Sequence, residues 1–241
     1  MIEKFKNYLF ILKRTNNISR YLLPPIIYRS FVILRNSWIP FYEERQRKRQ
    51  LLNTVLFDGN DDIFKKEIGK IKVYGEIGCG QSTCFAANAA NIEVIYSVDN
   101  SQEWINYVKD AVMSKKVNLI HIDLGVLGEW GRPKGYEKIE NLDHYALSLI
   151  NQKHKPELIL IDGRFRVFCF LRIITSCDYD LKIIFDDYLE ERAYYKIVEK
   201  IIVPSFTNGR QALFEINEDF RKSGGIENAT KMIESFRFVM D

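Results

Sequence analysis

Short apolar runs alternate with segments of helical periodicity through most of the chain. The apolar runs are rich in β-branched residues and predict strands at residues 71–77, 93–99, 117–123, 157–162, 181–187 and 211–217. Helices are predicted between the first five runs, and they begin at Ser82 or Thr83, at Ser101, near Asn141 and after Gly163. This alternation predicts a parallel sheet covered by helices on both faces.

The flanks of this alternation predict the domain organisation. A short helix begins at Asp61 and Asp62 and ends near Gly69, and a C-terminal helix begins at about Ile226. A chain of 241 residues is long enough for one large α/β domain with an appendage. We expect a helical arm over residues 1–60 and one domain over residues 61–241.

The predicted arm differs from the domain in charge and in aromatic content. Residues 1–50 hold 11 Lys and Arg against three Asp and Glu, a net charge of +8, whereas the whole chain carries +3. Apolar positions in the arm recur at helical spacing and predict three short helices. A basic arm favours an anionic partner, so we expect peripheral membrane contact or a homo-oligomer through residues 1–50. Nucleic acid is not favoured as a substrate, because the rest of the chain is acidic and has no Asn-Pro-Pro-Tyr-like motif.

Targeting and cysteine patterns favour a cytoplasmic protein. The segment 21–42 is apolar but carries Pro24, Pro25, Arg29 and Arg35, which makes it a poor membrane span, and no signal peptide is predicted. The four cysteines form no Cys-x-x-Cys pair and only three histidines occur, so a zinc site is not favoured. We expect reduced thiols at all four positions.

The stretch YGEIGCGQST, residues 74–83, places two glycines between the first predicted strand and a helix. Gly78 and Gly80 allow the backbone to turn with positive φ and to pass close to a ligand. The dinucleotide fingerprint would need glycine where Thr83 stands, and the chain has no Gly-Lys-Ser/Thr phosphate loop.

Two acids near this loop favour a nucleoside cofactor without phosphate. Glu76 precedes the glycines, where its carboxylate would repel a pyrophosphate and attract an ammonium or sulfonium group. Asp99 ends the next strand, where a carboxylate accepts both hydroxyls of a ribose. Ser82 or Thr83 caps the following helix and completes the predicted site. A tight turn without a ligand is the alternative.

The motifs EIGCGQST, VDNS, HIDLG, LILIDGRFR and IIFDDY, within about residues 70–217, resemble those of the class I S-adenosylmethionine-dependent methyltransferases. The resemblance implies a Rossmann-like three-layer α/β sandwich whose mostly parallel sheet has seven strands, the last antiparallel. It implies S-adenosylmethionine as cofactor, with Gly78 and Gly80 beside its methionine part, Asp99 at the ribose and Asp123 near the adenine. One departure is Gln81, which stands where many members have a third glycine. GEWG, IDGRFRV and FDDY resemble a bacterial group of such proteins.

Three acids follow the fourth and fifth predicted strands. Asp162, Asp186 and Asp187 should meet at one edge of the sheet and offer oxygen ligands to Mg²⁺. The arrangement resembles the metal-dependent O-methyltransferases, in which such acids hold Mg²⁺. An ion pair between Asp162 and Arg164 or Arg166 would neutralise the site without metal, and we keep it as an alternative.

Several residues near these acids are candidates for catalysis and substrate binding. Asp162, Asp187 and His144 are the catalytic candidates, whereas His121 is expected to belong to the core. Arg164 and Arg166 are candidates for holding an anionic group of the substrate. Trp130 lies in the glycine-rich segment 123–136, a predicted lid, where it stacks on a sugar ring or pins the loop to the body.

The leading hypothesis is methyl transfer from S-adenosylmethionine to a hydroxyl of a small polar or saccharide acceptor, with assistance from Mg²⁺. One alternative is a nicotinamide-dependent oxidoreductase, which Thr83 and Glu76 disfavour. Another is a non-catalytic protein of methyltransferase fold that acts through its N-terminal arm.

Overall fold

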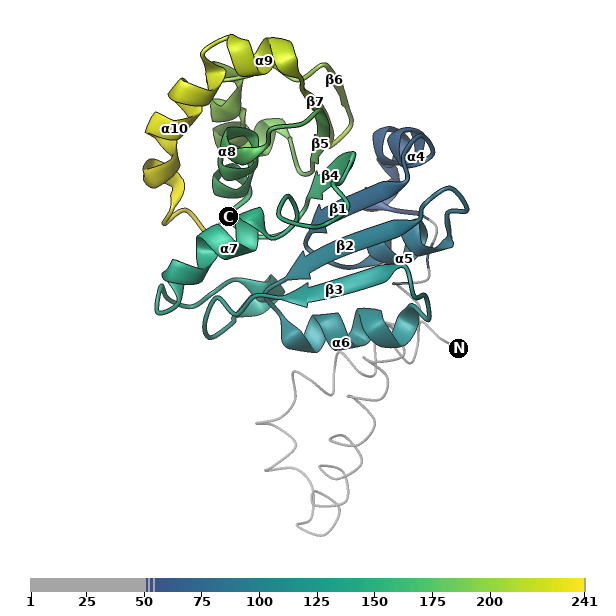
Figure 1. Ribbon diagram of the computed structural model, residues 1–241. Coiled ribbons are helices and arrows are strands. Elements are labelled where there is room, and N and C mark those ends of the chain that lie inside the picture. The colour runs from purple at the N-terminus through teal and green to yellow at the C-terminus, as the bar shows by residue number, and fades with distance from the viewer. Residues whose placement is uncertain (1–50, 52, 54, 241) are drawn as a thin grey trace, which may run out of the picture. The chain divides into compact units, whose positions relative to one another are not determined.

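The computed structural model describes residues 51, 53 and 55–240 (Figure 1). The helical arm, its partners and the weak membrane segment were predicted for residues that lie outside this range. The compact body begins at Leu51. Leu51 and Leu56 are buried in its core, so these two residues pack with the domain, although both were assigned to the arm.

The body is built on one seven-stranded sheet with the order β3-β2-β1-β4-β5-β7-β6. The strands are β1 (Val73–Ile77), β2 (Val94–Asp99), β3 (Val117–His121), β4 (Leu158–Ile161), β5 (Leu181–Phe185), β6 (Phe206–Asn208) and β7 (Gln211–Ile216). The five strands from β3 to β5 are parallel, and β7 is antiparallel to both of its neighbours, β5 and β6. The predicted Rossmann-like fold, with a mostly parallel seven-stranded sheet, is confirmed.

Helices flank the sheet and connect its strands. They are α4 (Asp62–Ile68), α5 (Gln81–Asn88), α6 (Gln102–Ala111), α7 (Leu142–Leu147), α8 (Arg166–Ser176), α9 (Glu218–Lys222) and α10 (Gly225–Phe236). The predicted starts of α6 and α7 are confirmed, with Ser101 and Asn141 as N-caps, and the Ser101 hydroxyl accepts the Trp104 amide at 3.2 Å. The sequence patterns did not predict β6, α9 or the 3-10 helical segment Glu190–Lys200.

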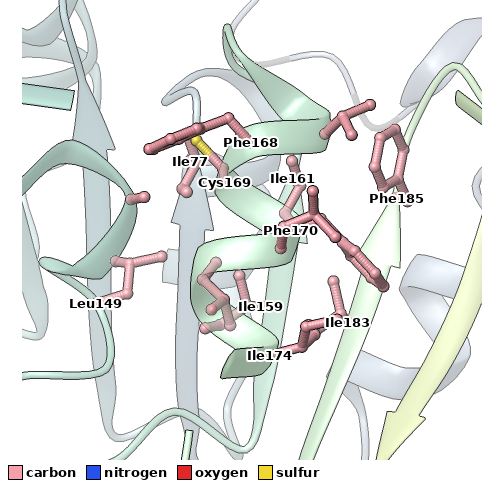
Figure 2. Close-up of a cluster of buried hydrophobic side chains, with 14 of the residues drawn as sticks. Ile77, Leu149, Ile159, Ile161, Phe168, Cys169, Phe170, Ile174, Ile183 and Phe185 are labelled. Atoms are coloured by element: carbon pink, nitrogen blue, oxygen red, sulfur yellow. The ribbon is translucent and has the colours of Figure 1, made fainter. Parts of the chain in front are cut away.

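The side chains of β4 show how the sheet is buried on both faces. Leu158 and Leu160 pack in one cluster with residues of α4 and α5. Ile159 and Ile161 point to the opposite face and join a larger cluster with residues of α7, α8 and α10 (Figure 2). In Figure 1, α8 and α10 accordingly lie together on one side of the sheet and α4 on the other. Because β1, β2, β4 and β5 run parallel, their carboxyl ends lie at one edge of the sheet, where open α/β sheets bind ligands.

The structure bears on two of the bulk predictions. All four cysteines are free and buried, as expected for reduced thiols. Over the described part of the chain, every helix is either too short or too polar to cross a bilayer.

Candidate cofactor site and acid–arginine cluster

The loop between β1 and α5 uses its two glycines differently. Gly78 has φ of +95°, and a Cβ on it would lie 2.7 Å from the backbone nitrogen of Gly163. Any side chain at this position would therefore separate the ends of β1 and β4. Gly80 is extended, with φ of 172°, and the nearest atom to its added Cβ is Trp104 Nε1 at 3.8 Å. Gly78 closes the turn, whereas Gly80 leaves space beside the loop.

The carboxylate of Glu76 organises this loop from inside the protein. Glu76 is fully buried and accepts hydrogen bonds from Tyr74 Oη at 3.0 Å, Ser82 Oγ at 2.5 Å and Thr83 Oγ1. The Thr83 hydroxyl also accepts the Gly80 amide at 2.9 Å. Burial raises the pKa of Glu76, and these hydroxyl donors oppose that rise. Glu76 and Ser82 were predicted to meet the cofactor, and the structure places both in the network that shapes the loop.

The carboxylate of Asp99 lies at the end of β2 against the same loop. It accepts the Cys79 amide at 3.1 Å and the Ser101 amide at 2.7 Å, one on each oxygen. Burial raises the pKa of Asp99, and both amides favour its ionised form. A carboxylate offers about four lone-pair positions, so each oxygen can still accept one ribose hydroxyl.

Asp123 lies beyond β3 and is much more open than Asp99. Its side chain is 46% exposed, pairs with Lys138 and accepts the Gly125 amide at 2.8 Å. The hydrogen bond from Lys138 lowers the pKa of Asp123. Its role near the adenine stays a prediction.

The segment 123–136 is held at the strand-end edge by its backbone and polar side chains. The Trp130 carbonyl accepts Arg164 Nε at 2.9 Å, and the Gly131 carbonyl accepts Asn100 Nδ2 at 2.8 Å. At its far end, Arg132 Nε and Tyr136 Oη donate to the carbonyls of Met240 and Phe238 at 3.2 and 2.8 Å. The Trp130 side chain itself is 88% exposed, so its main chain fastens the loop while its indole faces solvent.

The three acids after β4 and β5 meet as predicted. Asp162, Asp186 and Asp187 each bring a carboxylate oxygen within 4.8 Å of the other two. Their side chains differ in exposure, at 30%, 0% and 11% respectively. Burial and the nearby Asp186 raise the pKa of Asp162 well above its usual range, and Arg166 opposes the rise.

Three arginines neutralise this group, which we call the acid–arginine cluster. The buried Arg166 lies 3.0 Å from an oxygen of Asp162 and 2.9 Å from one of Asp187. Arg210 Nη2 lies 2.5 Å from Asp186, and Arg192 Nη1 lies 3.0 Å from Asp187.

The sequence left two interpretations of these acids, a Mg²⁺ site and an ion pair with an arginine. The structure contains the ion pair. Arg166 pairs with Asp162, whereas Arg164 bonds to the lid carbonyl of Trp130. Arg166 was also a candidate for substrate binding, and its burial in the cluster gives it a structural role instead. The sequence analysis missed Arg192 and Arg210, because only the pairing of β7 with β5 and the fold of Glu190–Lys200 bring them here.

The cluster does not fit a Mg²⁺ ion as it stands. The carboxylates supply the hard oxygen ligands that Mg²⁺ prefers, but each of them is in an ion pair with a guanidinium group. To reach the carboxylates, a cation would have to displace the guanidinium groups, whose positive charge would repel it. The expectation of Mg²⁺ is therefore not supported, and no step of the chemistry is assigned to it.

His144 and Tyr145 are neighbours in α7, but only Tyr145 is buried. His144 is exposed and lies outside the group of acids that come within reach of one another. His121 was expected to belong to the core, but it is exposed at the end of β3, the strand at one edge of the described sheet, and its Nε2 lies 3.2 Å from the Asn100 carbonyl. Tyr145, which the sequence analysis did not single out, is fully buried beside Gly163, where an added Cβ would lie 2.5 Å from its hydroxyl oxygen. Tyr145 stands among apolar residues in the sequence, so it could not be distinguished from the core positions around it.

A groove of about 790 Å³ lies elsewhere, between Glu190–Lys200 and β6. None of the residues predicted for the site lines it. The candidate site residues that the structure brings together therefore lie at the strand ends and not in this groove.

Comparison with known proteins supports the fold assignment. No protein-family model matches the sequence, and no curated protein matches it either. A methyltransferase-like protein from Silicibacter pomeroyi DSS-3 superposes with a TM-score of 0.62 at 25% identity, over 76% of this chain and 96% of that one. TYW2 from M. jannaschii, solved with AdoMet, matches over 67% of this chain and 77% of that chain, with a TM-score of 0.37 at 9% identity. A likeness at this last level supports no statement about activity.

The protein thus has the Rossmann-like α/β fold of the class I methyltransferases. One solved structure with this fold that it resembles over most of both chains is the methyltransferase-like protein from Silicibacter pomeroyi.

Proposed function

We propose that this protein transfers a methyl group from S-adenosylmethionine to a hydroxyl of a small polar or saccharide acceptor. The observation that carries the proposal is the position of Asp162. Its amide donates to the Ile77 carbonyl at 2.9 Å, and its carbonyl carbon lies 2.9 Å from where a Cβ of Gly78 would be. A partly exposed carboxylate therefore adjoins the glycine loop at the edge where the fold binds ligands.

The residues of the loop fit a nucleoside without phosphate. Gly80 leaves room beside the loop, and Asp99 keeps a lone pair on each oxygen for a ribose. Two buried carboxylates, Glu76 and Asp99, disfavour a pyrophosphate here and favour a cationic group. When bound, S-adenosylmethionine supplies an electrophilic methyl group on a sulfonium. The likeness to a methyltransferase-like protein supports methyl transfer as the reaction class.

Asp162 has the properties of a general base for the acceptor hydroxyl. Its raised pKa makes its carboxylate a better proton acceptor than an ordinary Asp. In the proposed step, Asp162 takes the proton as the acceptor oxygen bonds to the methyl carbon, and the electrons of the broken carbon–sulfur bond stay on sulfur. Arg166 holds Asp162 in place at 3.0 Å.

The mouth of the site supports a ring-shaped polar acceptor. Trp130 presents an exposed indole, on which the apolar face of a sugar can stack. Arg164 donates to the carbonyl of the same residue, which places its guanidinium group beside the Trp130 backbone. The IDGRFRV and FDDY motifs, which supply Asp162, Arg166 and Asp187, support membership of the bacterial group that they resemble.

The proposed cofactor is tested by calorimetry with S-adenosylhomocysteine and by NADH fluorescence. We expect the wild-type protein to bind S-adenosylhomocysteine with a micromolar dissociation constant and to leave NADH fluorescence unchanged, because the carboxylate of Asp99 lies against the loop where a pyrophosphate would bind. Binding of NADH without binding of S-adenosylhomocysteine would favour the oxidoreductase alternative instead.

Replacement of the base tests the chemistry. We expect Asp162→Asn to lower the rate of methyl transfer by roughly 10²–10⁴-fold, the usual contribution of a general base, while S-adenosylhomocysteine still binds. The wild-type rate should rise with pH through the raised pKa of Asp162, because only the ionised form accepts a proton, and the variant should lack this rise. Initial rates with radiolabelled cofactor measure both effects. An unchanged rate in the variant would remove Asp162 from the mechanism.

A further inference from the structure

The hydroxyl of Tyr145 is a buried polar group whose partner the described structure does not supply. Tyr145 is fully buried, and its Oη finds no hydrogen-bond partner among residues 51–240. A buried hydroxyl without a partner is destabilising by about 1–3 kcal/mol, so such groups in folded proteins call for an explanation.

The position of this hydroxyl connects it with the proposed cofactor site. It lies against Gly163, and an added Cβ on that glycine would also come within 3.1 Å of the Gly78 amide nitrogen. The Tyr145 hydroxyl thus adjoins the junction of the two loops that follow β1 and β4. Burial raises the pKa of Tyr145 well above its ordinary value, and the charge of Asp99 raises it further. The hydroxyl is therefore a neutral proton donor.

The start of α8 lies immediately beyond this junction. Gly163 and Arg164 precede Phe165, the N-cap of this 11-residue helix, and the Phe165 side chain makes no capping hydrogen bond. The first-turn amides and the helix dipole favour a negative charge at this end. The backbone amide of Arg164 is near enough to lower the pKa of Tyr145, although it makes no hydrogen bond with the Tyr145 oxygen.

We propose that Tyr145 and the N-terminus of α8 bind the carboxylate of the methionine part of S-adenosylmethionine, with the Tyr145 hydroxyl donating to it. A carboxylate is the acceptor that a neutral buried donor and a helix N-terminus favour together. Asp99, at the end of β2, takes the ribose hydroxyls, so the two residues bind opposite parts of one ligand. The inference rests on the proposed function and adds a residue that orients the methyl donor.

The test compares two variants with two ligands by calorimetry. Tyr145→Phe removes only the hydroxyl, and Tyr179→Phe is its matched control. The buried Tyr179 hydroxyl likewise has no hydrogen-bond partner within the described part of the chain, and Tyr179 lies between α8 and β5, at the opposite ends of the strands. S-adenosylhomocysteine carries the carboxylate, whereas 5′-methylthioadenosine lacks it and keeps the nucleoside.

We expect Tyr145→Phe to weaken S-adenosylhomocysteine binding by about tenfold, the effect of a hydrogen bond to a charged group, and to leave methylthioadenosine binding unchanged. Tyr179→Phe should alter neither affinity. Without ligand, Tyr145→Phe should melt no lower than the wild type, because the lost hydroxyl has no hydrogen-bond partner among the described residues.

Three outcomes would overturn the inference. These are unchanged S-adenosylhomocysteine affinity in Tyr145→Phe, equal weakening for both ligands, and a lower melting temperature of the ligand-free variant, which would give the hydroxyl a structural role. Failure of the wild-type protein to bind S-adenosylhomocysteine is a separate result and would overturn the proposed function itself.

Discussion

Gly78→Ala is expected to lower the free energy of unfolding by roughly 2 to 5 kcal/mol and to abolish binding of S-adenosylhomocysteine. Two costs add in this variant. Alanine is strained at φ of +95°, and its Cβ would meet backbone atoms of Asp162 and Gly163 at 2.7 to 2.9 Å. Neither contact can relax by a side-chain rotation, so the ends of β1 and β4 must move apart. Urea denaturation and calorimetry measure the two effects.

Gly80→Ala is the matched control for this prediction. Gly80 is extended, and the nearest neighbour of its added Cβ lies at an ordinary contact distance of 3.8 Å. We expect a loss of less than about 1 kcal/mol in stability, together with weaker cofactor binding, because the methyl group occupies the space that the loop leaves for a ligand. Equal destabilisation by the two substitutions would contradict this division between a folding glycine and a binding glycine.

Arg166→Met should have the second large effect, a loss of roughly 3 to 5 kcal/mol at neutral pH. The substitution keeps much of the side-chain volume but leaves Asp162 and Asp187 without their buried cation. Arg192→Met is the comparison, since Arg192 is 40% exposed and its ion pair with Asp187 is screened by water. We expect that variant to lose less than about 1 kcal/mol.

The pH dependence of the Arg166→Met defect provides a further check. The folded-state pKa of Asp162 is raised, so the cost of its charge applies above that pKa and disappears below the unfolded value. Removal of Arg166 increases this cost. The difference in stability between wild type and variant should therefore shrink as the pH falls through the carboxyl range. A difference that stays constant with pH would show that lost packing, not charge, causes the defect.

The sheet could be predicted from the sequence because both of its faces are buried. Continuous β-branched runs mark such strands, and the acids at their ends mark the ligand edge. The strand β6 escaped prediction because its three residues are exposed and follow Pro204, so no apolar pattern marks it. The segment Glu190–Lys200 escaped because it is a 3-10 helix interrupted at Arg192, where neither helical nor strand periodicity persists.

The candidate site was predictable only where it depends on strand ends. The meeting of Asp162 with Asp186 and Asp187 follows from parallel neighbouring strands and is confirmed. The arginine that faces Asp186 comes from the turn between β6 and β7, so its position depends on a long-range antiparallel pairing. The Tyr145 hydroxyl could not be recognised at all, because a tyrosine at a core position of a helix has the same pattern whether its oxygen is satisfied or not.

The fastening of the lid segment to residues 238 and 240 has a practical consequence. Tyr136 and Phe238 also pack edge to face, with ring centroids 5.1 Å apart, so Phe238 and Met240 hold the far end of the segment 123–136. A purification tag, a fusion partner or a truncation at the C-terminus would act on the loop that bears Trp130, more than a hundred residues away in sequence.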